Sequence, residues 1–337
     1  MPVAMKNAVG LYHKDELLIG GGYTGSSRDD AMVHTYDPNF NIWNTLPPAP
    51  LKWSALASLG DKIVLIGGKE VGKPKVNYSN KLAVLDEERK EWKFLDPPMY
   101  TARMSPVVHT HDGYLIVAGG SKGSLDYNME IFDLRARRWT VASPLPYKCL
   151  RNTSTTIDGV WYLLNEDSGL IHYAEMATII QHHISDSRPR SATTGSAMQR
   201  PPVPKRGVPP LLKVTSDELL IIPNHEIWRP LETQPPTRPF RITTTKSHLL
   251  ALSLAKGAVS AHAYMDGLWQ YVGKLPFMVS TASVAVDSLG QVFLFGGEGG
   301  CGHYSNKLSK AFLAEKTSKK HELHVALDTA ATIINSN

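Results

Sequence analysis

The sequence is poor in cysteine and has no long apolar segment. Its 337 residues include only two cysteines, Cys149 and Cys301, which lie far apart in the chain. They cannot form the disulfide framework that is typical of small secreted domains. No apolar run approaches the ~18 residues that a membrane-spanning helix requires, and the first residues lack the apolar core of a signal peptide. We therefore expect a cytoplasmic protein with no membrane partner.

Outside a single segment, positive and negative charges nearly balance. The formal net charge is +5, and residues 186–206 alone contribute +4 of it. A nucleic-acid-binding domain places its basic residues on a folded surface. Here they lie in a stretch rich in Pro, Ser, Thr and Arg, which cannot bury a core. We expect residues 185–210 to be a disordered insertion, and we expect no nucleic-acid partner.

What the chain does contain is a long-period repeat. Residues 17–43 comprise a short apolar run that ends in glycines, a polar loop, a strand-like run closed by a turn, and a tryptophan. The same order returns at residues 63–92 and 114–139. Together with the run that precedes each one, these units are typical of four short strands separated by turns. Glycines at the end of a buried strand indicate close approach of another backbone.

Four features recur at matching places in these units: a glycine pair, an apolar residue followed by aspartate, a tryptophan, and a Leu-Pro exit. The residues concerned are Gly21-Gly22, Gly67-Gly68, Gly119-Gly120, Gly296-Gly297, Tyr36-Asp37, Leu85-Asp86, Phe132-Asp133, Trp43, Trp92, Trp139, Trp269, Leu46-Pro47, Leu145-Pro146 and Leu275-Pro276. This combination resembles the Kelch repeat. The resemblance implies an all-β, Kelch-type β-propeller, in which four-stranded antiparallel blades surround a central channel.

The number of blades follows from the tryptophans at positions 43, 92, 139, 228 and 269. Removing an insertion of about 40 residues between the third and fourth leaves spacings near the ~50 residues of one repeat. Five tryptophan-marked units and a glycine-marked last unit predict six blades. Counting residues 211–231 as a separate unit would give seven. Because the tryptophans recur at one place in the unit, we expect them to pack between blades rather than to bind a partner.

This interpretation also defines the boundaries of the propeller. Residues 1–315 form the propeller, interrupted by the insertion at 185–210, and residues 316–337 supply a closing strand or a tail. The middle of the chain is the most degenerate part, because Asn165-Glu166 stands where other units have two glycines. Residues 170–180 are predicted to form one or two further strands.

The resemblance implies a protein–protein interaction module that recognises its partner through rim loops. These loops join the second and third strands of a blade, or one blade to the next. Binding residues concentrate on loops that a rigid scaffold positions, and interface anchors are enriched in Tyr, Trp and Arg. The candidate partner-binding residues are Tyr23, Arg28, Trp53, Tyr78, Tyr100, Arg103, Tyr127, Arg151 and Tyr304.

Two classes of function remain open at this point. The chain is similar to the propellers of BTB–Kelch ubiquitin-ligase adaptors, although no BTB domain lies within it, and the resemblance also implies a cytoskeletal role. The competing interpretation is an enzyme of the Kelch-like propeller type, a sugar mutarotase or hydrolase with arginines and carboxylates in the central channel. No residue could be assigned a catalytic role, so we favour the non-enzymatic class and expect no cofactor.

Two weaker motifs remain. Pro201 and Pro204 lie three residues apart, and Arg206 follows two residues later. This spacing suits a polyproline II ligand for a Src-homology-type domain. His109 and His111 share one face of a predicted strand, but no third ligand is evident, and we expect no metal site.

Overall fold

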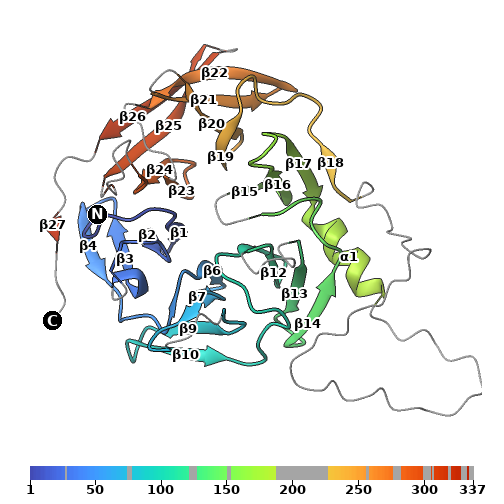
Figure 1. The fold of residues 1–337 in the computed structure, drawn as a ribbon. Coiled ribbons are helices and arrows are strands. Elements are labelled where there is room, and N and C mark those ends of the chain that lie inside the picture. The colour runs from blue at the N-terminus through green and yellow to red at the C-terminus, as the bar shows by residue number, and fades with distance from the viewer. Residues whose placement is uncertain are drawn as a thin grey trace, which may run out of the picture.

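The computed structural model describes residues 1–26, 29–73, 78–120, 127–149, 153–186, 227–255, 258–275, 282–298, 305, 307–317, 320–327 and 332–333. Six antiparallel sheets follow one another in chain order and surround a common centre (Figure 1). The protein is a six-bladed β-propeller, which confirms the count from the tryptophans. The alternative of seven blades is wrong.

Each blade is one continuous segment whose first strand is innermost and whose fourth strand is outermost. Blades 1 to 3 consist of β1 (Val9–His13), β2 (Glu16–Gly20), β3 (Val33–Asp37) and β4 (Ile42–Thr45); β6 (Ala55–Leu59), β7 (Lys62–Ile66), β9 (Leu82–Asp86) and β10 (Glu91–Leu95); and β11 (Val107–His111), β12 (Tyr114–Ala118), β13 (Met129–Asp133) and β14 (Arg138–Ala142). Blades 4 to 6 consist of β15 (Ser154–Ile157), β16 (Val160–Leu164), β17 (Ile171–Glu175) and β18 (Arg229–Pro230); β19 (Pro239–Thr244), β20 (Leu249–Ala255), β21 (Ala258–Met265) and β22 (Leu268–Leu275); and β23 (Ser283–Val286), β24 (Val292–Phe295), β25 (Leu308–Thr317) and β26 (Lys320–Leu327). Outside the blades lie η1 (Asp29–Ala31), β5 (Leu51–Lys52), β8 (Lys69–Glu70) and α1 (Met176–Asp186), whereas β27 (Thr332–Ile333) adds a fifth strand beside β4 in the sheet of blade 1.

The hydrophobic core is divided among the junctions between blades. In the described part of the chain, buried side chains form six clusters, and each combines residues from two successive blades, including blade 6 with blade 1. The second strands β2, β7 and β12 are apolar along most of their length because neighbouring blades cover both of their faces. Burial of apolar surface between the sheets therefore stabilises the ring as a whole.

The blade-end tryptophans pack as their repetition predicts. The Nε1–H groups of Trp92, Trp139 and Trp269 each donate a hydrogen bond of 2.9 Å to a linker carbonyl 45, 42 and 36 residues earlier in the chain. The acceptor residues are Pro47, Pro97 and Thr233. Each tryptophan thus ties its own outer strand to the linker that leaves the preceding blade.

The ring closes where the first residues of the chain meet blade 6. Met5 donates its N–H to the carbonyl of Ser305 over 3.2 Å and accepts a 2.8 Å bond from the N–H of Gly297. The hydroxyl of Ser283 donates to the carbonyl of Ala8 over 2.5 Å. Residues 320–327 are the outer strand of blade 6, and β25 continues past residue 315, where we expected the propeller to end. The short strand β27 pairs in parallel with β4.

Residues 176–186 form a helix, so the prediction of strands throughout residues 170–180 is wrong after position 175. Helix α1 lies on the outside of the ring beside blades 3 and 4 (Figure 1). Its buried residues Met176, Ile179 and Ile180 join the cluster that contains Trp161 and Trp228. Their spacing of three and four residues is the apolar stripe of a surface helix. Among the described residues, no helix is long and apolar enough to cross a membrane.

Candidate partner-binding surface

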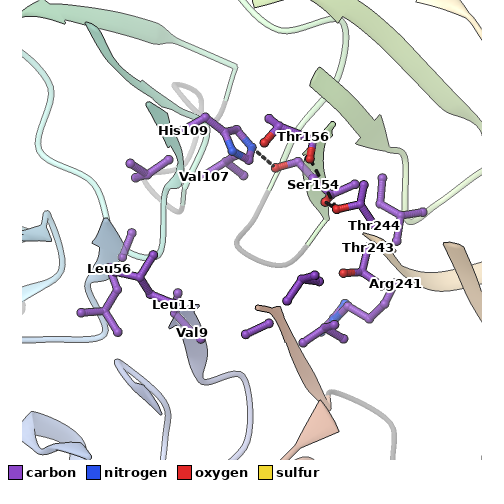
Figure 2. Close-up of a pocket in the computed structure, with 18 of the residues that line it drawn as sticks. Val9, Leu11, Leu56, Val107, His109, Ser154, Thr156, Arg241, Thr243 and Thr244 are labelled. Atoms are coloured by element: carbon purple, nitrogen blue, oxygen red, sulfur yellow. Dashed lines mark hydrogen bonds between the residues drawn. The ribbon is translucent and has the colours of Figure 1, made fainter. Parts of the chain in front are cut away.

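A cavity of about 360 Å³ lies between the innermost strands of all six blades (Figure 2). One side of its wall is aliphatic and includes Val9, Leu56 and Val107. The opposite side, from blades 4 and 5, presents hydroxyl groups, among them those of Ser154 and Thr244. The cavity is therefore the central channel predicted from the repeat, and its lining is mainly neutral.

Among the described residues that line this cavity, two have titratable side chains. Arg241 is only 5% exposed, and its Nη1 donates to Glu166 Oε1 over 2.9 Å while its Nε donates to the carbonyl of Ala282. Nε2 of His109 lies 2.8 Å from Ser154 Oγ, and burial lowers the pKa of His109 to about 3, so the ring is neutral at pH 7. No carboxylate is among the described residues that line the cavity.

The rim of blades 1 and 2 presents a more distinctive arrangement, which we call the rim platform: Lys6, Tyr23, Lys52, Trp53 and Lys69. The rings of Tyr23 and Trp53 lie 6.3 Å apart, although they belong to loops of different blades. The Nζ atoms of Lys52 and Lys69 lie 4.8 Å and 6.0 Å from the centre of the Trp53 ring, and that of Lys6 lies 5.8 Å from the Tyr23 ring. Aromatic faces attract cations at such distances.

Short backbone pairings hold the rim platform in place. The linker strand β5 pairs with β8 in the loop of blade 2 that joins its second and third strands, so Lys52 lies opposite Lys69. In blade 1, Lys6 and Tyr23 form an antiparallel bridge with N–O distances of 3.0 and 2.9 Å. The linker and the loop of each of these two blades thus form one ordered surface. A partner could bind to this surface without first having to order these segments.

Apart from Arg103, the predicted site residues fall into three groups. Tyr23 and Trp53 come together on the rim platform, and Tyr78 lies beside it through a bridge to Lys69. Tyr100 and Tyr127 are 61% and 37% exposed on other blades. Six predicted residues lie outside the described part of the chain: Arg28, Arg151, Tyr304, Pro201, Pro204 and Arg206.

Arg103 is buried within the fold rather than displayed on the rim. Its side chain is 1% exposed, and Nη2 lies 2.6 Å from Oε1 of Glu130, which is equally buried. Nη1 donates to the carbonyls of Gly119 and Asn128 at 2.9 and 2.8 Å. These contacts give Arg103 a role in stabilising blade 3, and we leave it out of the proposed surface.

The lysines of the rim platform were not among the predicted residues. Lys52 and Lys69 are 17 positions apart in the sequence and belong to no motif. The alternation Leu51, Lys52, Trp53 before β6 was the available signal, but only the pairing of β5 with β8 places Lys52 against Lys69. Among the described residues, no three or more His, Cys, Asp or Glu side chains gather in a way that could hold a metal ion.

Comparisons with known proteins agree with this architecture. The family model of the Kelch motif matches residues 102–146. Over 151 residues the chain is 30% identical to Kelch-like protein 40 of Mus musculus, covering 44% of this chain and 24% of that protein. Over 104 residues it is 33% identical to an F-box/kelch-repeat protein of Arabidopsis thaliana, covering 30% of this chain and 37% of that protein. The alignments thus span less than two fifths of the length of these relatives.

Among solved structures, that of YjhT is similar over 97% of this chain and 98% of its own, with a TM-score of 0.66 and 13% identity. At that identity the likeness concerns the fold. Fold and junctions define the chain as a six-bladed β-propeller. The chain also carries a Kelch motif at residues 102–146 and is similar, over part of its length, to Kelch-repeat proteins.

Proposed function

We propose that this propeller is a protein-interaction module that recognises a protein partner through the loops of its rim. The observation that carries the proposal is the rim platform, where the exposed ring of Tyr23, the half-buried ring of Trp53 and lysines from two blades meet on an ordered backbone. Interface anchors are enriched in such aromatic residues. The Kelch-type relatives support the same class of function.

The partner belongs, in our proposal, to a system in which the propeller selects a protein for another component. The names of the relatives, Kelch-like and F-box/kelch-repeat, support recognition of substrates for a ubiquitin ligase, and the cytoskeletal role that the Kelch resemblance implies is the second choice. We propose that the protein acts in the cytoplasm, where the buried thiol of Cys149 would remain reduced.

The sugar-enzyme alternative receives no support from the cavity. A mutarotase or hydrolase of the expected kind would bring arginines and carboxylates to the channel. The guanidinium of Arg241 is instead bound to Glu166, and the described lining residues include no carboxylate. We therefore do not develop a catalytic proposal.

Site-specific photo-crosslinking can test which face binds. A photoreactive phenylalanine analogue replaces Val71, which is 46% exposed beside β8, or replaces Phe40 or Leu289, which are 74% and 71% exposed in hairpin loops at the opposite ends of the strands. We expect crosslinks to a cellular protein from position 71 and none from positions 40 and 289. Crosslinks confined to the two hairpin positions would contradict the proposal.

A further inference from the structure

The central cavity has a wall of two kinds, and the division does not follow the repeat. The innermost strands of blades 1, 2, 3 and 6 bring mainly aliphatic side chains to it, such as those of Val9 and Val108. The innermost strands of blades 4 and 5 bring hydroxyl groups instead, from residues 154–156 in β15 and from Thr243 and Thr244 in β19. One half of the cavity is thus apolar, and the other half is lined by hydroxyl groups (Figure 2).

The apolar half is not fully covered by the packing of the blades. Val9, Val108 and Val286 each pack against the cluster of a blade junction, yet each is only half-buried. All three line the cavity, so part of each side chain faces it. Apolar surface that stays in contact with water forgoes about 25 cal/mol per Å². An apolar group that filled this half of the cavity would therefore be held by surface that folding leaves open.

The hydroxyl half retains hydrogen-bonding capacity. Thr155 Oγ1 lies 3.4 Å from Thr244 Oγ1, which in turn lies 3.4 Å from the carbonyl oxygen of Thr156. Both distances exceed the roughly 2.5–3.0 Å of an ordinary bond between a hydroxyl group and an oxygen atom. The hydroxyl of Thr156, a half-buried residue, makes no hydrogen bond within the described part of the chain. Polar groups of a ligand can thus pair here without displacing a strong bond between protein groups.

No uncompensated charge reaches the cavity from its described lining residues. His109 is neutral at pH 7, because burial lowers its pKa to about 3, and its Nε2 lies 2.8 Å from Ser154 Oγ. Nη1 of Arg241 donates to the carboxylate of Glu166 and to the carbonyl of Phe240, at 2.9 and 2.7 Å. A charged ligand would lose its hydration in this cavity and gain no counter-charge, which is costly.

We propose that the central cavity binds a small uncharged molecule, with an apolar ring or chain against the valines of blades 1, 3 and 6 and a hydroxyl or amide group against the hydroxyls of blade 4. The volume of about 360 Å³ lies within the roughly 300–1,000 Å³ of small-molecule sites, which combine apolar walls with a few convergent polar groups. Such a ligand would contact strands of several blades, so its binding would stabilise the ring. This site shares no residue with the rim platform and goes beyond the proposed function.

Ligand-observed saturation-transfer NMR can test this site with a fragment library whose members form matched sets. One set is cyclohexylmethanol, cyclohexanecarboxylate and cyclohexylmethylammonium, which share a ring and differ in charge. Two variants exchange residues of nearly equal shape: Thr156→Val removes a hydroxyl from the polar half, and Val9→Thr adds one to the apolar half. The matched control is Thr110→Val, at an exposed position of β11 that does not line the cavity. Melting temperatures of all variants separate loss of binding from loss of folding.

We expect uncharged members such as cyclohexylmethanol to bind, to compete with one another, and to bind at least about tenfold more tightly than their charged counterparts. Thr156→Val and Val9→Thr should each weaken the binding of uncharged members about three- to tenfold, and Thr110→Val should leave it unchanged. Stronger binding of the carboxylates or ammonium ions, no binding of any uncharged member, or equal binding to the wild type and to both cavity variants would overturn the site. Photo-crosslinking from position 71 reports on the rim alone, so the proposed function is tested separately.

Discussion

The junction between blades 2 and 3 differs from the junction between blades 4 and 5 in one contact. In each, the residue pair that follows the second strand of a blade meets the chain that leads into the next blade. In the first, the N–H of Gly68 donates to the carbonyl of Arg103 over 2.7 Å. A Cβ atom on Gly67 would lie 2.5 Å from the same carbonyl oxygen, so only glycine allows this approach. The contact is made by backbone alone, and the side chain of Arg103 turns into blade 3 to reach Glu130.

In the second junction, Asn165-Glu166 replaces the glycines and side chains make the contact. Arg238 donates to the carbonyl of Glu166 through Nε at 2.9 Å and also through Nη2. Arg241 donates to the carboxylate of Glu166 over 2.9 Å. Without glycine, the two backbones cannot approach as closely, and two arginines, Arg238 of the linker and Arg241 of β19, bridge the remaining distance. The same architecture is thus held by a dry backbone contact in one place and by a partly exposed ion pair in another.

The largest difference is expected between the two ion pairs. Glu130→Gln leaves the buried guanidinium of Arg103 without a counter-charge, which should cost about 3–5 kcal/mol of unfolding free energy. Glu166→Gln should cost less, about 1–2 kcal/mol, because the Glu166 side chain is 45% exposed and water screens its charge, although its partner Arg241 is only 6% exposed. Urea denaturation measures both. Equal losses would show that the two junctions do not differ as their burial indicates.

The glycine contact can be broken on its own. Gly67→Ala should lower the unfolding free energy by about 2–4 kcal/mol, because the new methyl group meets the carbonyl of Arg103 and the backbone is left-handed. Gly60 is the matched control, since its φ of +63° is close to the +66° of Gly67 and a Cβ atom added there would meet no other atom within 4 Å. Gly60→Ala should therefore cost only about 1 kcal/mol. A similar loss at both positions would mean that conformation alone requires the glycine.

A third junction should respond to pH where the two arginine junctions do not. His109 of blade 3 lies against Ser154 of blade 4, and burial lowers its pKa to about 3. Below the ordinary pKa of ~6.5 the unfolded chain gains a proton that the folded protein does not, so stability falls as pH decreases. The slope for this group is at most about 1.4 kcal/mol per pH unit. Thermal unfolding between pH 7 and 5 should show a smaller slope for His109→Gln, and an unchanged slope would contradict the assignment.

The periodic parts of the fold could be predicted because each blade meets the same physical demand. Trp92 and Trp139 occupy one place in the repeat, and their shared bond to a linker carbonyl explains their recurrence. Helix α1 shows where this reasoning fails, since residues 176–180 continue an apolar run in which strand and helix patterns overlap. The local stripe of Met176, Ile179 and Ile180 indicates a helix only when the whole window is read.

The candidate site could be predicted only in part. The rim-loop positions of the tyrosines and of Trp53 could be predicted from the repeat, whereas the burial of Arg103 could not. Its burial depends on Glu130, which is 27 residues away in the chain and whose carboxylate pairs with the Arg103 guanidinium inside blade 3. Because Arg103 and Glu130 lie far apart in the sequence, no local spacing of residues indicates that they form an ion pair.

By itself, the sequence determined that the chain is a propeller of six or seven blades and where the glycines and tryptophans of each blade lie, because sheets that pack side by side need the same residues at the same place in every repeat. Tertiary structure decided which charged residues are buried and which meet on the rim. Lys52, Trp53, Lys69 and Tyr23 come together because β5 pairs with β8 and because blade 1 lies against blade 2. Contacts between blades join residues whose separations in the sequence do not match the period of the repeat. The rim platform consists of such contacts.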